Sequence, residues 1–321
     1  MRIFRHVAAL PASARRAVVA IGNFDGVHRG HQAVIGEAVR RARAIALPAA
    51  VLTFEPHPRR FFRPDQPPFL LTRLRTKLRV IAALGVDLVY LPRFDARLAG
   101  IPAEGFVDAV LVRDLDLAHA VVGYDFVFGR GRLGTPETLR ARLAAAGRDV
   151  TIMAPVARPG AAGIEDEGLI YSSTGVRDAL AAGDPGAAAT LLGRRFEIEG
   201  RVVRGDRRGR TIGFPTANLW LGEMLRPRLG VYAVRVRIGS ATEPVDGVAN
   251  LGLRPTFGGD PEPRLEVHLF DLDADLYGQR LCVELVAFLR AERRFEGIDA
   301  LKAQIAADAG AARKVLADLP R

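Results

Sequence analysis

Residues 22–31 (GNFDGVHRGH) place three glycines and two histidines within ten positions, a combination suited to holding a phosphate. An apolar run at 18–21 precedes this segment, and apolar residues at the i, i+3, i+4 spacing of a helix follow it over 32–46. The pattern predicts a strand, a glycine-rich turn and the start of a helix. Backbone N–H groups of the turn and the positive end of the helix dipole then face the same point, which makes an anion site.

The two histidines, His28 and His31, lie three positions apart at the expected helix entrance, where both can donate hydrogen bonds to phosphate oxygens. Neither has a serine or cysteine beside it, so nucleophilic catalysis is not indicated. We expect them to stabilise charge while the α-phosphorus of a nucleotide is attacked. The segment is not a P-loop, because GxxxxGK[ST] is absent and none of the three lysines follows a glycine. A surface loop with two ordinary histidines is the alternative interpretation.

Other segments of the first half are compatible with a ligand site but do not require one. Residues 53–58 (TFEPHP) form a rigid loop after an apolar run, at the carboxyl edge where α/β sheets bind ligands, and an ordinary proline-rich turn fits equally well. Residues 129–134 match the dinucleotide fingerprint GxGxxG, but the acidic residue at the required distance, Asp149, precedes its strand instead of ending it. Residues 171–177 (YSSTGVR) offer hydroxyl groups to cap a helix, with or without a ligand.

In the second half, residues 200–209 (GRVVRGDRRG) are rich in glycine and arginine and precede the turn 213–218 (GFPTAN). Such a loop can close over a polyphosphate, because arginine pairs with phosphate oxygens. The Thr216 hydroxyl and the Asn218 carbonyl are oxygen donors suited to Mg²⁺ that is held mainly by ATP. An ordinary turn with an arginine-rich rim stays open, as does a solvated strand position for Glu266.

The chain changes character near residue 185. Before it, apolar runs alternate with helical patterns, which predicts βαβ units around a parallel sheet; after it, closely spaced strands predict an antiparallel sheet or small barrel. The expected strands are 18–21, 49–54, 88–91, 120–123, 150–153, 198–203, 230–238, 245–251, 265–270 and 281–286, and the expected helices are 32–46, 72–84, 103–112 and 296–319. We therefore expect one domain over 1–184 and a second over 185–321.

The composition is that of a folded chain of two domains, with 321 residues, 49% hydrophobic and 26% charged. The net charge of +10 suggests nucleic-acid binding, but 43 of the 46 cationic residues are arginines spread over the whole length, so we expect no nucleic-acid face. The single cysteine, Cys282, excludes an internal disulfide and favours a reducing, cytoplasmic setting. The longest apolar run, 44–54, is short and contains Pro48, so no membrane segment is expected.

The full string at 22–31 closely resembles one family, the bacterial bifunctional riboflavin kinase/FAD synthetases. Further segments similar to motifs of that family, in the family's order, are 53–58, 123–129 (GYDFVFG), 172–177, 213–218, 247–257, 266–271 and 275–278. Tyr171 and Val176 replace the isoleucines usual in the family's serine-rich motif. The resemblance implies a Rossmann-like α/β nucleotidyltransferase domain, followed by an antiparallel six-stranded β-barrel, the riboflavin kinase, with a C-terminal helix.

The same resemblance implies a bifunctional enzyme of flavin cofactor synthesis. A kinase activity would convert riboflavin and ATP to FMN, and an FMN adenylyltransferase activity would convert FMN and a second ATP to FAD and pyrophosphate. It makes His28 and His31 catalytic in the first domain, and Glu266 the base that takes the proton of the flavin's ribityl hydroxyl in the second. Mg²⁺ would serve both steps, with Thr216 and Asn218 as its candidate ligands in the kinase.

The resemblance also implies the residues that bind the substrates. In the adenylyltransferase, the nucleotide residues are Gly22, Phe24, Asp25, Gly30, Ser172, Ser173, Thr174 and Arg177. The flavin residues there are Pro56, His57, Pro58, Asp125 and Phe128. In the kinase, the nucleotide residues are Gly205, Arg210, Gly213, Phe214, Pro215, Thr216 and Asn218.

Two other functions compete with this one. The first is a nucleotidyltransferase for another small substrate, against which the GFPTAN half argues. The second is a non-catalytic RNA-binding protein, which should interleave stacking aromatics with its arginines, whereas aromatic residues make up 7% of this chain. The expected partners are riboflavin, FMN, FAD and ATP, with neither nucleic acid nor membrane, and the sequence is compatible with a homo-oligomer.

Overall fold

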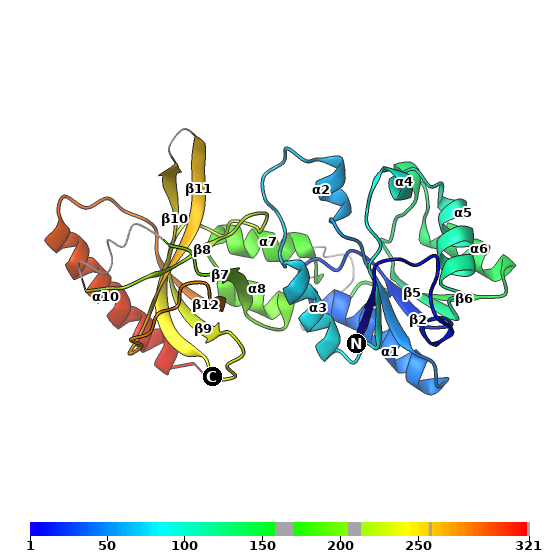
Figure 1. The fold of residues 1–321 in the computed structure, drawn as a ribbon, viewed down its shortest axis with the longest axis horizontal. Helices are drawn as coiled ribbons and strands as arrows, with labels where there is room; N and C mark the ends of the chain where they lie inside the picture. Colours follow the sequence, from blue (N-terminus) through cyan, green and yellow to red (C-terminus); the bar gives the residue numbers. More distant parts are fainter. Residues whose placement is uncertain (158–169, 205–212, 257–258, 320–321) are drawn as a thin grey trace. The chain divides into compact units, whose positions relative to one another are not determined.

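The computed structural model describes residues 1–157, 170–204, 213–256 and 259–319, drawn in colour in Figure 1. The chain divides into two compact units. Unit 1 comprises Met1–Gln66 and Leu74–Ser172, and unit 2 comprises Pro67–Arg73 and Ser173–Arg321. In the part of the chain that the structure describes, no helix has both the length and the apolar character needed to cross a bilayer.

Unit 1 is built on a six-stranded parallel sheet in the order β1-β4-β3-β2-β5-β6. The strands are β1 (Arg2–Phe4), β2 (Val18–Ile21), β3 (Ala49–Leu52), β4 (Leu88–Tyr90), β5 (His119–Gly123) and β6 (Asp149–Met153). From β2 the chain adds β3 and then β4 on one side, and it later returns to add β5 on the other side of β2. The order therefore reverses between β2 and β5, at the place where open α/β sheets bind ligands. The structure confirms the Rossmann-like sheet expected from the sequence.

Helices cover both faces of this sheet, as the continuous apolar runs of its strands require. The helical segments of unit 1 are η1 (Ala12–Ala14), α1 (Arg29–Ala44), α2 (Pro58–Phe62), α3 (Leu74–Ala83), α4 (Ala96–Ala99), α5 (Ala103–Gly105), the π-helical η2 (Phe106–Asp114), η3 (Arg130–Arg132) and α6 (Pro136–Ala145). Val18 and Ala20 of β2 pack into the core formed with α1 and α3. Val19 and Ile21 pack into the core formed with η2 and α6.

Unit 2 contains an antiparallel sheet of six strands in the order β7-β12-β9-β10-β11-β8. The strands are β7 (Phe196–Arg201), β8 (Ala217–Trp220), β9 (Gly230–Ile238), β10 (Val245–Thr256), β11 (Gly259–Leu269) and β12 (Arg280–Arg290). The first and last strands of this order approach each other, because the Val203 amide just after β7 donates to the Asn218 carbonyl of β8 at 2.9 Å. The sheet thereby closes into the expected six-stranded barrel.

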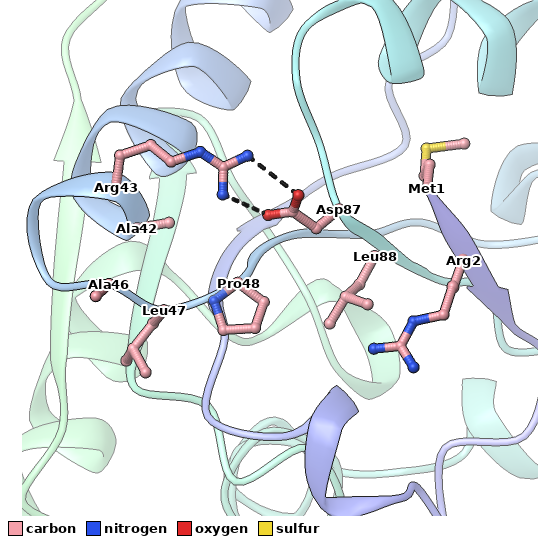
Figure 2. A pocket seen from close by; sticks show the side chains of 9 residues that line it. All are labelled: Met1, Arg2, Ala42, Arg43, Ala46, Leu47, Pro48, Asp87 and Leu88. Atoms are coloured by element: carbon pink, nitrogen blue, oxygen red, sulfur yellow. Dashed lines mark hydrogen bonds and ion pairs between the residues drawn. The ribbon is translucent and has the colours of Figure 1, made fainter.

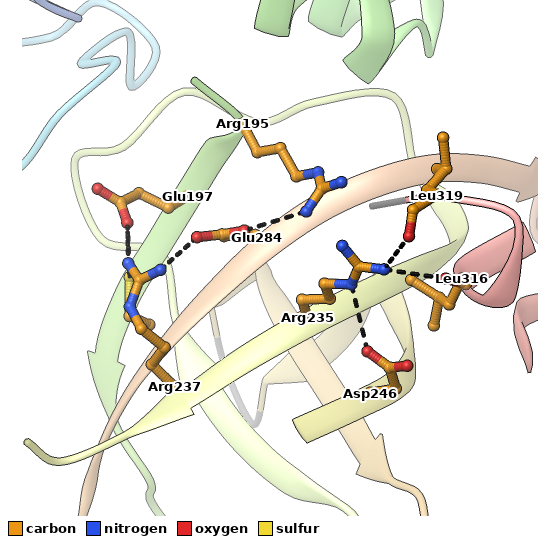
Figure 3. A network of polar contacts seen from close by, with 9 residues as sticks. Arg195, Glu197, Arg235, Arg237, Asp246, Glu284, Leu316 and Leu319 are labelled. Carbon is orange, nitrogen blue, oxygen red and sulfur yellow. Dashed lines mark hydrogen bonds and ion pairs between the residues drawn. The ribbon is translucent and has the colours of Figure 1, made fainter. Parts of the chain in front are cut away.

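In the described residues of unit 2, the helices are α7 (Ser173–Ala182), α8 (Pro185–Leu192) and α10 (Ile298–Ala317). The last of these lies against the barrel (Figure 1), with Ala312 and Leu316 in an apolar cluster that includes Val231 and Val248. Arg235 of β9, 1% exposed, fastens the end of the helix: its Nη2 donates to the carbonyls of Leu316 at 2.9 Å and Leu319 at 2.8 Å (Figure 3). The structure confirms the C-terminal helix.

A second charged group in Figure 3 joins the strands β7, β9 and β12. Arg237 donates to Glu284 and, at 3.0 Å, to Glu197. The Cys282 thiol donates to the same Glu197 carboxylate at 2.7 Å. The one cysteine of the chain thus takes part in a polar network on the barrel wall.

A short segment from the first half of the sequence belongs to unit 2. Leu70 forms two backbone hydrogen bonds, accepting from Leu225 at 2.8 Å and donating to Glu223 at 3.2 Å. Arg73 donates to the Trp220 carbonyl at 2.7 Å. This assignment of residues 67–73 to unit 2 was not predicted, because they carry no periodic apolar pattern of their own.

The expected elements and the observed ones differ in several places. Strand β1 and helix α8 were not expected, and the GFPTAN segment, expected as a turn, continues into strand β8. Helix α8 begins where the sequence changes character near residue 185: Asp184 caps it by accepting from the Ala187 amide at 2.8 Å, with Pro185 in its first turn. Residues 157–168, where the periodic apolar pattern gives way to proline, glycine and acidic residues, fall almost wholly outside the described residues.

Candidate active sites

Three of the motif segments meet at the carboxyl edge of the unit 1 sheet. Residues 22–31 follow β2, residues 53–58 follow β3, and residues 123–129 begin at the end of β5. These strands are neighbours in the order β3-β2-β5, so the segments that follow them lie on either side of the reversal point. The fold thus brings together stretches that are about 30 to 100 positions apart in the sequence.

The loop Gly22–His28, here named the anion loop, is held in a strained conformation. Phe24 and Val27 have φ values of 48° and 44°, in the left-handed region. A residue with a Cβ pays about 1–2 kcal/mol there, because the Cβ approaches the following carbonyl oxygen. Phe24, Asp25 and Val27 are nonetheless buried, Asp25 to 2% exposure. A strained loop persists only where its surroundings impose the conformation.

His28 caps helix α1, and its ring stacks on that of His31. The His28 Nδ1 accepts from the His31 amide at 3.4 Å, and the two ring centroids are 3.6 Å apart. With Nδ1 accepting, the proton of neutral His28 resides on Nε2, which is the nitrogen able to donate to a ligand oxygen. The structure therefore brings both predicted catalytic histidines to the N-terminus of α1, beside the anion loop.

Gly30, in the first turn of α1, is required by close packing. A Cβ at this position would lie 3.1 Å from the Tyr171 carbonyl and 3.2 Å from the His28 ring. The backbone of Tyr171 therefore packs against the start of α1, and the next residue, Ser172, is the last residue of unit 1. Of the serine-rich motif, only Ser172 belongs to the unit that contains the anion loop.

The rest of that motif lies on helix α7 of unit 2, where Ser173 and Thr174 form its first turn. The Arg177 Nε donates to the Phe69 carbonyl at 3.0 Å, and its guanidinium carbon lies 5.7 Å from the centroid of the Phe69 ring. Arg177 is thus bound to the segment 67–73, which also belongs to unit 2.

Sequence reasoning missed Lys77 of α3. Its side chain is 3% exposed, and its Nζ donates to the Asn23 carbonyl of the anion loop at 2.9 Å. The available signal was its spacing: Lys77 stands at helical intervals from Leu74 and Ile81, on the face that packs into the core. A lysine on such a face needs a polar partner.

The 53–58 segment also has local structural duties. His57 caps α2 by accepting from the Arg59 amide at 3.1 Å, and Pro58 occupies the first turn of that helix. The Glu55–Pro56 peptide bond is cis. Of the predicted flavin residues, Pro56, His57 and Pro58 therefore all lie in one compact turn beyond β3.

A chain of phenylalanine rings links this turn to the segment after β5. The rings in contact, in order, are Phe126, Phe128, Phe106, Phe54, Phe94, Phe61 and Phe62. Phe128, a predicted flavin residue, is buried within it, whereas Phe62 at its other end is 61% exposed. Sequence reasoning missed this chain, although Phe61 and Phe62 lie three and four positions after the predicted motif 53–58.

Asp125, the remaining predicted flavin residue, is exposed. Its Oδ1 lies 3.0 Å from the point where Gly123 would carry a Cβ, so the carboxylate folds back over the end of β5. The GxGxxG match at 129–134 lies in the long loop between β5 and α6, and Asp149 is the first residue of β6. The short strand-to-helix turn of a dinucleotide fingerprint is not formed there.

In unit 2 the strand register aligns three polar side chains across the barrel. Glu266 of β11 is paired with Asn218 of β8 on one side and with Asn250 of β10 on the other. We name these three residues the polar row. Cross-strand partners share a face of the sheet, so the row lies opposite the buried side chains of Leu265 and Val267. Glu266 itself is half-buried.

His268, two positions beyond Glu266, holds the predicted nucleotide turn against this face. Its Nδ1 lies 2.9 Å from the Pro215 carbonyl, and its ring packs edge-on against Phe214 with 5.4 Å between centroids. Because the carbonyl accepts, the proton is on Nδ1. The turn then leads through Thr216 directly into Asn218 of the polar row.

Two predicted kinase residues, Gly205 and Arg210, lie outside the described residues. Of the candidate metal ligands, Thr216 is half-buried, and the Asn218 side chain is buried with its Nδ2 3.5 Å from the Thr216 carbonyl. Among the residues with described positions, no cluster of three histidine, cysteine or carboxylate side chains could hold a metal by itself.

A pocket on unit 1 lies away from these motifs (Figure 2). Its lining includes Arg2 and Leu88, at the starts of β1 and β4, so it opens at the amino edge of the sheet. Arg43 on its wall is paired with Asp87 at 2.7 Å, and Arg2 donates to the Ser13 carbonyl at 2.8 Å. Both arginines already have protein partners, so this pocket is a weaker candidate for an anion site.

Two family models match successive parts of the chain. A model described as FAD synthetase matches residues 10–164, and one described as riboflavin kinase matches residues 192–316. The first match contains the anion loop and the segments after β3 and β5. The second contains the GFPTAN turn and the polar row.

Curated relatives match almost the whole chain and share one name, bifunctional riboflavin kinase/FMN adenylyltransferase. The protein of Escherichia coli (strain K12) is 46% identical over 297 residues, covering 92% of this chain and 92% of its own. That of Pseudomonas fluorescens is 43% identical, covering 99% and 98%, and that of Bacillus subtilis (strain 168) is 38% identical, covering 91% and 90%.

A solved structure has the same fold over most of its length. This crystal structure, described as a macrolide-efflux protein from Streptococcus pneumoniae, matches with a TM-score of 0.80 and 33% sequence identity. The match covers 93% of this chain and 94% of the other.

Proposed function

The chain belongs to the family of bifunctional riboflavin kinase/FMN adenylyltransferases, and from this premise we propose how its two units divide the reactions. Unit 2 transfers the γ-phosphoryl group of ATP to riboflavin, giving FMN and ADP. Unit 1 transfers the adenylyl group of a second ATP to FMN, giving FAD and pyrophosphate. The observation that carries this division is that the FAD synthetase match contains the anion loop and the riboflavin kinase match contains the polar row.

In unit 1, a phosphate oxygen of FMN attacks the α-phosphorus of ATP and pyrophosphate leaves. His28 and His31 donate to the phosphate oxygens on which negative charge increases, at the positive end of α1. This stabilisation needs no nucleophile of the protein. The proposed nucleotide residues of unit 1 are Gly22, Phe24, Asp25, Gly30 and Ser172. Ser173, Thr174 and Arg177, which belong to unit 2, stay a prediction from the sequence.

The flavin ring of FMN is proposed to bind beside the segments after β3 and β5. Pro56, His57, Pro58, Asp125 and Phe128 are the proposed contacts. The phenylalanine chain supports this position, because its exposed end at Phe62 offers an aromatic surface at the end of α2. A planar ring gains both apolar burial and favourable ring packing from such a surface.

In unit 2, Glu266 accepts the proton of the ribityl hydroxyl as that oxygen attacks the γ-phosphorus. Asn218 and Asn250 flank it on neighbouring strands and can orient its carboxylate or the substrate. His268 holds the nucleotide turn through the Pro215 carbonyl. The proposed nucleotide residues of the kinase are Gly205, Arg210, Gly213, Phe214, Pro215, Thr216 and Asn218.

ATP is a co-substrate of both activities, and we propose Mg²⁺ as the metal that accompanies it. The donor set fits this ion, because the Thr216 hydroxyl and the Asn218 amide oxygen are hard ligands next to the Glu266 carboxylate. Mg²⁺ is held mainly by phosphates and water and needs few protein ligands. When bound, it would offset the phosphate charge.

The remaining expectations are part of the same proposal. A domain boundary at 184/185 lies between the two family matches, as does the division of the compact units at 172/173. The matches favour flavins over another small substrate and over RNA. A cytoplasmic location rests on the single cysteine, and we propose no membrane or nucleic-acid partner.

The decisive experiment follows the flavins by chromatography. The purified protein is incubated with riboflavin, ATP and Mg²⁺, and a parallel reaction starts from FMN. We expect FMN and then FAD from riboflavin, FAD alone from FMN, and pyrophosphate only in the adenylyl step. FMN without FAD would contradict the assignment of unit 1, and no turnover of any flavin would contradict the whole proposal.

A further inference from the structure

The backbone carbonyl of Asn23, in the anion loop, is held from two sides by buried side chains. The Lys77 Nζ of α3 donates to it at 2.9 Å, and the Thr53 Oγ1, just beyond β3, donates to it at 3.1 Å. Thr53 is fully buried and Lys77 is 3% exposed. A carbonyl has two lone pairs, so this pair of contacts satisfies it completely.

This carbonyl sits immediately before the strained part of the loop. Phe24, Gly26 and Val27 all have positive φ values, and only the glycine adopts them without a steric penalty. His28, the next residue, is the N-cap of α1. The two hydrogen bonds to the Asn23 carbonyl therefore hold the loop just before residues 24–27, whose backbone angles determine the orientation of His28.

Lys77 also brings a positive charge under the loop. The carboxylates that face it are Asp25 of the loop and Glu55 beyond β3, and both oppose the effect of burial, which lowers the pKa of Lys77. Asp25 is 2% exposed, and a buried carboxylate is costly unless a cation offsets its charge. Lys77 supplies that charge and so stabilises this form of the loop, which Thr53 cannot do.

We propose that Lys77 is a positioning residue for adenylyl transfer, which holds the anion loop in the form that presents His28 and the start of α1 to the nucleotide. Its ammonium group both fixes the Asn23 carbonyl and compensates Asp25. This role rests on the proposed adenylyltransferase activity of unit 1. Lys77 acts through the loop and contacts no reacting atom in this assignment.

The test uses the full chain and measures the two activities separately. Lys77→Met removes the donor and the charge but keeps a side chain of similar length. We expect kcat for FAD formation from FMN to fall about 10- to 100-fold, because a small displacement of a catalytic group has effects of that size. The KM values for ATP and FMN should change less than about threefold, and FMN formation from riboflavin should be unaffected. Lys302→Met, at an exposed position of α10, is the matched control.

Two further variants separate positioning from simple structural support. Lys77→Arg keeps the charge and should recover part of the lost kcat. Thr53→Val keeps Lys77 but removes the second donor, and should lower kcat by about threefold to tenfold with unchanged KM; it also provides a test if Lys77→Met does not fold. The proposal is wrong if these variants keep wild-type kcat, or if they lose it only together with ATP affinity. Absence of FAD formation in the wild-type protein would instead refute the activity of unit 1.

Discussion

The candidate site of unit 1 depends on one strained loop, whereas that of unit 2 depends on the register of neighbouring strands. In unit 1, Phe24 and Val27 hold disfavoured backbone angles, and buried groups from β3 and α3 keep them there. In unit 2, Glu266 is placed by its ladder partners Asn218 and Asn250, in ordinary extended backbone.

The difference shows two ways to orient a charged transition state. A strained loop places several backbone N–H groups and a helix terminus at one point, at a cost that the surrounding core must meet. A sheet places alternate side chains on one face without strain, but their positions relative to one another depend on the register of the strands. We therefore expect unit 1 to be sensitive to single buried contacts below the loop, and unit 2 to be sensitive to whatever holds the barrel together.

Replacing both histidines should produce the largest effect. His28→Ala with His31→Ala removes two donors from the start of α1, and loss of a single such donor usually costs about 100- to 1000-fold in kcat. We expect FAD formation from FMN to fall by about 10⁴-fold or below detection, with FMN formation unchanged. Product analysis of both reactions measures this. Loss of both activities in a folded protein would contradict the separation into two sites.

Glu266→Gln tests the other side of the comparison. The amide keeps the size of the carboxylate and its place in the polar row but cannot accept the proton, so we expect FMN formation to fall by about 10³-fold. FAD formation from added FMN should stay at the wild-type rate. Retention of kinase activity within about tenfold would show that Glu266 is not the base.

The architecture could be predicted from the sequence where apolar periodicity was strong. Strand 18–21 was predicted to the residue, because its apolar run ends directly at the glycine-rich turn that begins with Gly22. Strand β1 was missed, because its three residues include Arg2 and are followed by Arg5, which leaves only two apolar positions. Strand β8 was missed because the residues just before it, 213–216 (GFPT), resembled a turn, and only the pairing with β11 makes it a strand.

The candidate sites could be predicted only as far as their residues stand together in the sequence. His28 and His31 were found from their spacing beside glycines. Lys77 and the phenylalanine chain were not found, because their partners lie far away along the chain and are brought together by the sheet. The transfer of residues 67–73 to unit 2 has the same cause, since it depends on backbone pairing with residues 223–225.

Arg235→Met should weaken unit 2 selectively. It removes the bonds to the carbonyls of Leu316 in the last turn of α10 and of Leu319 just beyond it, and leaves Asp246 without the guanidinium 3.3 Å away, a loss of about 2–3 kcal/mol for a buried group. We expect the unfolding midpoint of unit 2 to fall by about 5–10 °C. After brief heating, FMN formation should be lost at a lower temperature than FAD formation from FMN.

Arg313→Met is the matched control for this experiment. Arg313 also joins α10 to the barrel, through Asp271 at 2.8 Å, but both side chains are largely exposed. Exposed ion pairs contribute little, so the midpoint should move by less than about 2 °C. Equal effects of the two variants would show that burial of Arg235 is not what fastens the helix.

The smallest expected effect concerns His119, at the start of β5 in unit 1. Its Nε2 lies 2.8 Å from the Thr151 hydroxyl, and burial, with a smaller contribution from the Arg41 charge, lowers the pKa of its imidazole; Asp149 and Glu37 oppose this. In the window between this lowered pKa and the ordinary value of about 6.5, the unfolded chain binds more protons, so stability rises with pH. The contribution is complete above about pH 6.5 and is lost as the pH falls through the folded-state pKa.

Thermal unfolding of the wild type and of His119→Gln from pH 5 to pH 8 tests this directly. The midpoint of the wild type, relative to the variant, should be about 1–2 °C higher at pH 8 than at pH 5. His6→Gln, at an exposed position, is the control and should show no such trend. A difference independent of pH would mean that His119 contributes only by its contact with Thr151. A pH-dependent difference would show that unit 1 is sensitive to single buried polar groups in its sheet as well as in its loop.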